Sequence, residues 1–295
     1  MKKIKKAVIP VGGEGTRMFP MTKAFSKEFL PLCDCNGKIK PAIMYLIVEL
    51  DEIGIEEIYI IVTKKYQKEF YNHFFFDDVS DFCKDCLSLD NMNYLKKIKK
   101  ISKKIKIYYE ENIRGFGHVL YYCNKFIHNE SFLLLLGDQI YKSYDSCSCL
   151  KQIVNNYDGN LTISVSKVDI ENVSKYGILK GDFINDSSFL ITNIKEKPTK
   201  LYAKKYLRMS YKNEEAYFSV FGTYILNKKL LEEVKLFFDN EKELKSEYQL
   251  TPFLERYKEN KVAFIPNGRY FDIGNLKSYN KAYIEFQKNY NKVKM

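Results

Sequence analysis

The chain has 295 residues, of which 45% are hydrophobic, and this is enough for one large α/β domain with a full core. No apolar stretch reaches the roughly 20 residues that a membrane-spanning helix needs, so we expect no insertion into a membrane. The net charge of +11 is compatible with nucleic acid, an anionic membrane surface or phosphorylated small molecules as partners.

The basic residues that follow Met1 precede an apolar run that is too short for a secretory signal, so we expect a cytoplasmic protein. Seven cysteines without an export signal favour reduced thiols over a disulfide framework. Zinc is a minor alternative, because no histidine pattern accompanies the three close cysteine pairs, which are Cys33/Cys35, Cys83/Cys86 and Cys147/Cys149.

Strands and helices alternate over the first half of the chain. The run from Ile4 to Val11 predicts a buried strand that enters a glycine loop, and Pro41 opens a helical pattern that Gly54 ends. Further elements are expected at 58–62 (strand), 65–75 (helix), 105–109 (strand), 117–126 (helix) and 132–136 (strand). This alternation is typical of a Rossmann-like α/β fold with a mostly parallel mixed sheet and helices on both faces.

The second half of the chain is more mixed. Residues 76–104 resemble an insertion between core elements, and their lysine-rich end, interleaved with Ile, predicts an amphipathic segment with a solvated face rather than a nucleic-acid patch. Strands are expected at 161–168, 177–180, 189–195, 217–226 and 261–265, and helices at 230–238, 251–258 and 276–290.

A glycine-rich loop, Gly12-Gly13-Glu14-Gly15-Thr16-Arg17, directly follows the first strand. Its glycines let backbone N–H groups approach phosphates, and Arg17 adds a planar set of donors for phosphate oxygens. Lys27 is a second cation that a folded-back loop could bring to the same phosphates. The loop is not a Walker A loop, and Met18 stands where a dinucleotide-binding loop needs its third glycine. A bare glycine turn is the alternative, although the ordered cations and prolines up to Pro31 argue against it.

The segment from Gly12 to Pro31 resembles the signature of the sugar-1-phosphate nucleotidyltransferases, which form sugar nucleotides. Later segments resemble the bacterial glucose-1-phosphate uridylyltransferases in particular, in the order of that family and over nearly the whole chain. These segments are PAIMYLIVEL with GIEEIYIIV (41–62), RGFGH (114–118), LLGD (135–138), YG (176–177), EKP (196–198), FGTYIL (221–226), EYQLT (247–251) and FDIGN (271–275).

The resemblance implies one nucleotidyltransferase domain over 1–295, with a nucleotide-binding half near 1–140, a sugar-binding half near 141–275 and a closing helix near 276–292. It also implies transfer of a uridylyl group from UTP to glucose 1-phosphate, which gives UDP-glucose and pyrophosphate. A phosphate monoester has a second pKa near 6, so the attacking oxygen is largely ionised near neutrality and needs no general base. The reaction instead needs cations where negative charge accumulates.

The expected site residues follow from the same resemblance. Arg17, Lys27 and Lys197 are the expected catalytic cations, and Asp138 and Asp272 would hold Mg²⁺. Without the resemblance, their positions favour a turn or helix-cap role for Asp138 and an Asx turn for Asp272. Gly177, Glu196 and Lys197 would bind the sugar 1-phosphate. The expected nucleotide-binding residues are Gly12, Gly13, Glu14, Gly15, Thr16, Arg17, Lys27, Glu110, Gly117 and Asp138.

The choice of base is less determined by the sequence. Glu110 or Glu111 stands where related uridylyl and thymidylyl enzymes have a Gln that reads the base. An ionised carboxylate can accept from uracil N3–H but cannot donate to O4, and it would suit the amino group of cytosine at least as well. Gly117 is expected to open a helix, which would leave its N–H free for the base. On the sugar side, Thr223 stands where the family usually has an Arg.

Two other functions stay open at this stage. The same chemistry could use CTP or dTTP, or a sugar 1-phosphate other than that of glucose. Alternatively, the chain could be a non-catalytic subunit that binds sugar nucleotides, although the joint presence of the expected cations and metal ligands argues against this. We expect small-molecule substrates and neither a nucleic-acid nor a membrane partner, and the resemblance implies a homodimer or homotetramer.

Overall fold

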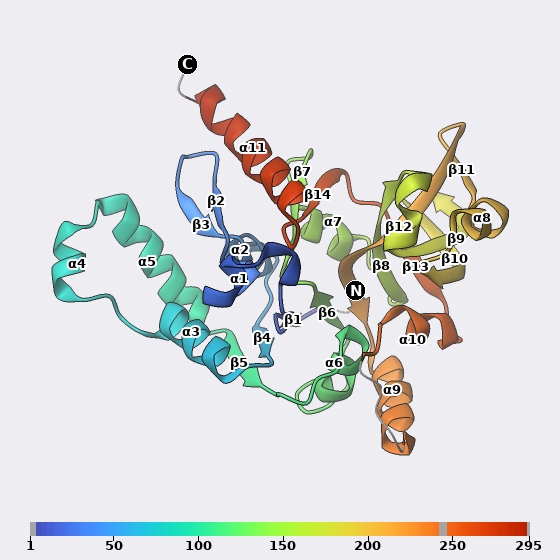
Figure 1. The fold of residues 1–295 in the computed structure, drawn as a ribbon, viewed down its shortest axis with the longest axis horizontal. Coiled ribbons are helices and arrows are strands. Elements are labelled where there is room, and N and C mark those ends of the chain that lie inside the picture. The colour runs from blue at the N-terminus through green and yellow to red at the C-terminus, as the bar shows by residue number, and fades with distance from the viewer. Residues whose placement is uncertain (1–3, 242–246, 294–295) are drawn as a thin grey trace. The chain divides into compact units, whose positions relative to one another are not determined.

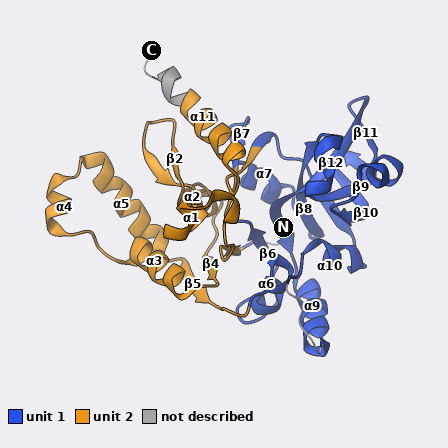
Figure 2. Ribbon diagram, viewed as in Figure 1, with its two compact units in different colours: residues 1–4, 113–136, 141–269 blue, residues 5–112, 137–140, 270–295 orange. Residues whose placement is uncertain are grey.

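The computed structural model describes residues 4–241 and 247–293 (Figure 1). The chain forms two compact units (Figure 2): unit 1 comprises residues 1–4, 113–136 and 141–269, and unit 2 comprises residues 5–112, 137–140 and 270–295. Both units combine strands with helices, which confirms the α/β class. Compared with the expected halves, residues 113–136 group with the later part of the chain, and the closing helix groups with the earlier part. In the part of the chain that the structure describes, no helix has the length and apolar character needed to cross a membrane.

Unit 2 is built on three parallel strands in the order β5–β4–β1. They are β1 (Lys6–Pro10), β4 (Glu57–Val62) and β5 (Ile105–Tyr109). Val8 and Ile60 are fully buried, as expected for parallel strands that are covered on both faces. Because the strands are parallel, their carboxyl ends lie at one edge of the sheet, and ligands of open α/β sheets bind at this edge.

Helices and short segments complete unit 2. The helix expected after Pro41 is α2 (Ile43–Glu52), and it ends where Gly54 takes a positive φ of 86°, as the sequence predicts. The other elements are η1 (Thr16–Met18), α1 (Met21–Ala24), η2 (Lys27–Phe29), the hairpin β2 (Pro31–Cys33) and β3 (Ile39–Pro41), α3 (Lys65–Phe76) and α11 (Leu276–Val293).

The insertion 76–104 folds as α4 (Asp81–Cys86) and α5 (Leu89–Ser102), each capped at its start by a serine. The expected amphipathic segment is confirmed, because Ile98 and Ile101 are buried while the neighbouring lysines are exposed. The β2–β3 hairpin contacts α5 through two lysines, Lys38 and Lys40, whose ammonium groups each lie 5.1 Å from the ring centre of Tyr94.

Unit 1 contains a mixed sheet in the order β6–β12–β8–β13–β10–β9. Strands β8 and β13 run parallel, and the pairs β6–β12, β12–β8, β13–β10, β10–β9 and β12–β9 are antiparallel. The strands are β6 (Phe132–Leu135), β12 (Glu214–Leu226), β8 (Leu161–Val168), β13 (Lys261–Phe264), β10 (Ser188–Glu196) and β9 (Gly177–Asn185), and β11 (Met209–Tyr211) adds to β12.

The helices of unit 1 are short except for one. They are α6 (Phe116–Cys123), α7 (Cys149–Asn155), η3 (Ile170–Lys175), α8 (Lys200–Tyr202), η4 (Ala203–Leu207), α9 (Lys228–Asn240) and α10 (Thr251–Arg256). The chain passes between the units within β7 (Gln139–Ser143) and again within β14 (Gly268–Asp272), and these two strands pair with each other.

Every strand and helix that the sequence predicts is present, with ends displaced by a few residues. The largest difference is β9, which was expected to end at Lys180 and continues to Asn185. The strand continues through Gly181, where a Cβ atom would lie 1.9 Å from the carbonyl oxygen of Leu190, so a glycine permits the close approach of β10. Helix α7 was not predicted.

Aromatic side chains pack together on the sheet of unit 1, and the removal of one of these rings tests this packing. Phe189 is fully buried, and its ring centre lies 5.3 Å from that of Phe218. We expect Phe189→Ala to lower the free energy of unfolding by about 3–5 kcal/mol, because the change leaves a cavity. Urea denaturation measures this loss, with the 81% exposed Phe82→Ala as the control, which should change stability little. Equal effects of the two substitutions would contradict this packing.

Candidate active site

The glycine loop of unit 2 leaves the carboxyl end of β1 and is held by two threonines. Thr63 donates a hydrogen bond to the carbonyl of Gly12 at 2.9 Å, and a Cβ atom on Gly12 would lie 2.2 Å from the Thr63 methyl group. Gly15 takes a positive φ of 63°, and Thr22 donates to its carbonyl at 2.9 Å. The loop therefore requires glycine at both positions, for space at the first and for backbone conformation at the second.

Lys27 folds back onto this loop, as the sequence suggested. Its ammonium nitrogen lies 3.6 Å from the place where a Cβ atom on Gly13 would be, and it forms an ion pair with Asp138. Both side chains are largely buried. Burial lowers the pKa of Lys27, but the carboxylates of Asp138 and Glu28 raise it, and the net pKa lies above its ordinary value. The ammonium group therefore stays charged beside the loop.

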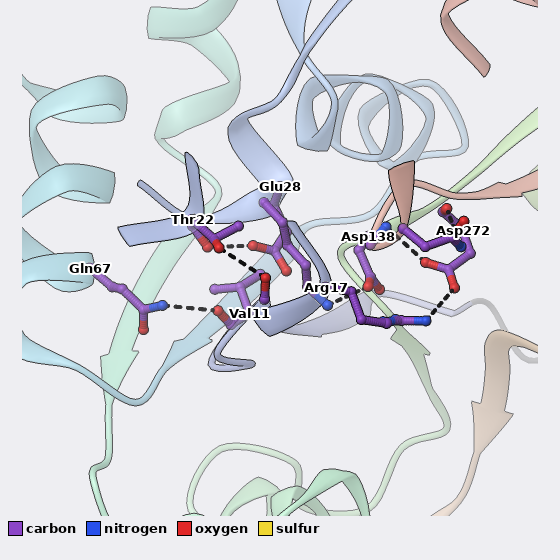
Figure 3. A network of polar contacts seen from close by, with 12 residues as sticks. Val11, Arg17, Thr22, Glu28, Gln67, Asp138 and Asp272 are labelled. Atoms are coloured by element: carbon purple, nitrogen blue, oxygen red, sulfur yellow. Dashed lines mark hydrogen bonds and ion pairs between the residues drawn. The ribbon is translucent and has the colours of Figure 1, made fainter. Parts of the chain in front are cut away.

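Three charged side chains converge around Gly274 (Figure 3). A Cβ atom on Gly274 would lie 2.7 Å from a carboxylate oxygen of Asp138, 2.9 Å from one of Asp272 and 3.1 Å from a guanidinium nitrogen of Arg17. A guanidinium nitrogen of Arg17 also lies 3.5 Å from a carboxylate oxygen of Asp272. The side chain of Arg17 is exposed, whereas that of Asp272 is largely buried. Asp272 accepts from the N–H of Gly274 at 2.8 Å, so the Asx turn anticipated for it is present alongside its place in the cluster.

Asp138 and Asp272 form a donor set that suits Mg²⁺. Two carboxylates from the protein leave further positions of an octahedral ion for phosphate oxygens and water, which is how Mg²⁺ is usually held beside nucleotides. In residues 4–241 and 247–293, no three His, Cys, Asp or Glu side chains gather into a metal-binding group. The set is therefore too small to enclose an ion without a phosphate ligand.

Glu28 is a buried member of the site to which the sequence analysis gave no role. It is 1% exposed and accepts a hydrogen bond from Ser26. Burial raises the pKa of Glu28 to about 7, although Lys27 lowers it, and Asp138 adds to the rise. A Cβ atom on Gly137 would lie 3.0 Å from the side chain of Glu28, so this glycine leaves room for the buried carboxyl group.

The remaining loop residues lie at the surface. Glu14 is exposed and forms an ion pair with Lys64, which compensates its charge next to the glycines. Thr16 begins η1 and is exposed. The partner of Glu14, Lys64, lies shortly after the end of β4.

The expected sugar residues meet in unit 1, where the ends of β9 and β10 pair Gly177 with Glu196. A Cβ atom on Gly177 would lie 3.0 Å from a carboxylate oxygen of Glu196 and 2.9 Å from the hydroxyl of Thr251. Lys197 has a positive φ of 43°, donates its N–H to the carbonyl of Tyr176 at 3.0 Å and is exposed. Thr251 is buried and was missed by the sequence analysis, although it belongs to the EYQLT segment that carries the resemblance.

The structure corrects the expectation for Gly117. Helix α6 begins at Phe116, and the N–H of Gly117 donates to the carbonyl of Tyr248 at 2.8 Å, so this donor is not free for a base. The hydrogen bond exists because segment 247–249 packs against the loop, where a Cβ atom on Gly117 would lie 2.5 Å from the carbonyl oxygen of Gln249. His118 is buried, stacks on Phe238 and braces the same loop.

Glu110 and Glu111 differ in their contacts. Glu110 follows β5, and its carboxylate accepts from the backbone N–H of Asn112 at 3.2 Å and from the Asn112 side chain at 3.0 Å. Glu111 is exposed and accepts from the hydroxyl of Tyr109 at 3.0 Å. Thr223 replaces the expected Arg and is buried, with its hydroxyl 3.1 Å from that of Tyr141.

The chain matches known proteins over nearly its whole length. The family model described as nucleotidyl transferase matches residues 6–289. The UTP–glucose-1-phosphate uridylyltransferase of Staphylococcus epidermidis is 31% identical over 97% of this chain and 93% of the relative. That of Bacillus subtilis is 30% identical over 97% of this chain and 92% of the relative.

A crystal structure of UDP-glucose pyrophosphorylase complexed with UDP-glucose superimposes with a TM-score of 0.75. It is 29% identical in sequence, and the match covers 98% of this chain and 99% of that chain. The match of the family model over almost the whole chain, together with these relatives, shows that the protein belongs to the nucleotidyl transferase family.

Proposed function

We propose that the protein transfers a uridylyl group from UTP to glucose 1-phosphate, which yields UDP-glucose and pyrophosphate. The observation that carries this proposal is the convergence of the glycine loop, Lys27 and the two carboxylates Asp138 and Asp272 in unit 2. The relatives named for this reaction, and the similar structure that binds UDP-glucose, support the same substrates.

In the proposed reaction, the ionised phosphate oxygen of glucose 1-phosphate attacks the α-phosphorus of UTP. The bond from that phosphorus to the bridging oxygen breaks, and pyrophosphate leaves. The backbone N–H groups of Gly12, Gly13 and Gly15 would bind the triphosphate, and Arg17 and Lys27 would offset the charge that develops on it. Glu14 and Thr16 would line the same loop at the surface.

Asp138 and Asp272 would hold Mg²⁺. When bound, the ion would neutralise phosphate charge and orient the oxygens of the leaving pyrophosphate. Before the substrate binds, Lys27 compensates the carboxylate of Asp138 and Arg17 lies beside that of Asp272. The two cations are therefore already placed next to the acidic residues when the triphosphate arrives.

We assign the sugar 1-phosphate to unit 1, with Gly177 and Glu196 at the sugar hydroxyls and Lys197 at the phosphate. The exposure of Lys197 leaves its ammonium group accessible to a phosphate. We assign the base to Glu110 rather than Glu111, because Glu110 directly follows β5 and is partly buried, whereas Glu111 is exposed. We further place the reaction in the cytoplasm and expect a homodimer or homotetramer, as the family resemblance implies.

The carboxylate of Glu110 also supports a second candidate, in which the same reaction uses CTP, because a carboxylate is a good acceptor for the cytosine amino group. The first test is pyrophosphate release from glucose 1-phosphate and Mg²⁺ with UTP, dTTP, CTP, ATP and GTP in parallel. We expect release with UTP to exceed that with CTP. Preferential release with CTP would replace the uridylyl proposal with the cytidylyl one, and no release with any of them would argue against this sugar phosphate.

The metal assignment predicts the effect of removing either carboxylate. We expect Asp138→Asn and Asp272→Asn each to lower the turnover number by about 100-fold or more, because charge stabilisation is the main source of catalysis. A matched control is Asp34→Asn, which also removes a buried carboxylate paired to a lysine, Lys40, in the β2–β3 hairpin. Full turnover in either site variant would remove these residues from the metal site.

The sugar assignment predicts a selective effect on one substrate. We expect Lys197→Met to raise KM for glucose 1-phosphate about 10-fold while KM for UTP stays unchanged, because only one charge-assisted phosphate contact is lost. Lys200→Met is the control, since Lys200 is equally exposed and pairs with Glu171. A parallel rise of both KM values in initial-rate measurements would contradict the assignment of Lys197 to the sugar phosphate.

A further inference from the structure

The ends of three neighbouring strands in unit 2 relate Glu110 to the glycine loop. Strand β1 leads into the loop, and Thr63, which follows β4, bonds to Gly12 of that loop. The N–H of Glu110, which follows β5, donates to the carbonyl of Val62 at 3.0 Å. The phosphate-binding loop and Glu110 are therefore separated by two strand spacings, roughly 10 Å, a length that a ribose can bridge between phosphates and base.

Asn112 supplies what the carboxylate of Glu110 lacks. Its backbone N–H and its side-chain amide nitrogen both donate to one carboxylate oxygen of Glu110, at 3.2 Å and 3.0 Å. A bond to a carboxylate requires a donor, so the NH₂ group of Asn112 faces Glu110. An amide nitrogen carries two hydrogens, and a carboxylate has about four acceptor sites. The two bonds between Asn112 and Glu110 therefore use up neither group by themselves, and the side chain of Asn112 is exposed.

We propose that Asn112 is a specificity-determining residue that reads the base together with Glu110, an inference that rests on the proposed function. Glu110 accepts a hydrogen bond from uracil N3–H, and the second amide hydrogen of Asn112 donates to uracil O4. The pair thus offers the acceptor and the donor that a single Gln would provide. Thymine shares this edge and is accepted equally.

Cytosine fits the same pair poorly. Its ring N3 is an acceptor and would face the carboxylate of Glu110, so two acceptors would oppose each other. Its exocyclic amino group is a donor and would face the NH₂ group of Asn112. The combination therefore turns a carboxylate that by itself would suit cytosine into a reader of uracil.

A purely structural role for Asn112 can be tested, because the chain contains a similar local motif elsewhere, with an Asp in place of the Glu. Asn160 donates its backbone N–H and its side-chain amide to Asp158, two residues earlier, at 2.9 Å and 3.0 Å. That motif precedes β8 and so lies at the amino end of a strand, whereas ligands of open α/β sheets bind at carboxyl ends. Asn160→Ala therefore measures what the loss of such a turn contact does by itself.

The experiment compares kcat/KM for UTP and CTP in five proteins: the wild type, Asn112→Ala, Glu110→Gln, the double variant and Asn160→Ala. We expect Asn112→Ala to lower the ratio of UTP to CTP about 10-fold, the effect of one lost hydrogen bond to a ligand. In the Glu110→Gln background the new amide donates to O4 itself, so Asn112→Ala should change the ratio little. Asn160→Ala should leave the ratio unchanged.

Equilibrium binding of UTP and CTP to the same proteins, without glucose 1-phosphate, separates this inference from the reaction. An unchanged ratio in Asn112→Ala, or equal losses in both backgrounds, would overturn the role of Asn112 while UTP turnover by the wild type still supports the proposed function. A similar fall of the ratio in Asn160→Ala would also overturn it. Absence of turnover with intact UTP-selective binding would contradict the reaction and leave the base reader standing.

Discussion

The contact on which the candidate site of unit 2 depends is the ion pair between Lys27 and Asp138. Both side chains are largely withdrawn from water, and an unpaired charge there would cost several kcal/mol. The pair links η2 to the segment that follows β6, two parts of the chain that are 111 residues apart. The pair also fixes Lys27 against Gly13 of the glycine loop. Its other partner, Asp138, lies against Gly274 beside Asp272. One electrostatic contact thus connects the glycine loop to the carboxylates of Asp138 and Asp272.

In the proposed reaction, a metal-bound triphosphate would take the place of the opposite charges in this pair. Without substrate, Lys27 compensates Asp138, and Arg17 lies beside Asp272. A triphosphate brings negative charge that suits the cations, while Mg²⁺ brings positive charge that suits the carboxylates. The protein can therefore keep four charged groups close together before binding, and it needs little reorganisation when the charged substrate enters. Glu28 adds a third carboxyl group beside Lys27, and its pKa is raised mainly by burial and further by the charge of Asp138.

The sequence was most informative where a physical constraint is local. The glycine loop after the first strand, in which Gly15 takes a positive φ, and the strand–helix alternation of unit 2 were predictable because the local sequence determines them. Contacts between distant segments were not. The N–H of Gly117 looked free at a helix start, yet segment 247–249 supplies its acceptor. The burial of Glu28 and the close approach of β10 to Gly181 were also not predicted, because they depend on contacts with residues elsewhere in the chain.

Glu110 illustrates the same distinction at the level of chemistry. Considered alone, a carboxylate in place of an amide changes which base edge a protein can bind. In the structure, the group that a base would meet is a carboxylate with an amide already bound to it. The pattern of donors and acceptors then belongs to two residues, and a substitution at one position has to be interpreted with its neighbour two residues later. Selectivity in such a site is a property of the hydrogen-bonded pair, because each partner determines which hydrogens and lone pairs the other can still offer.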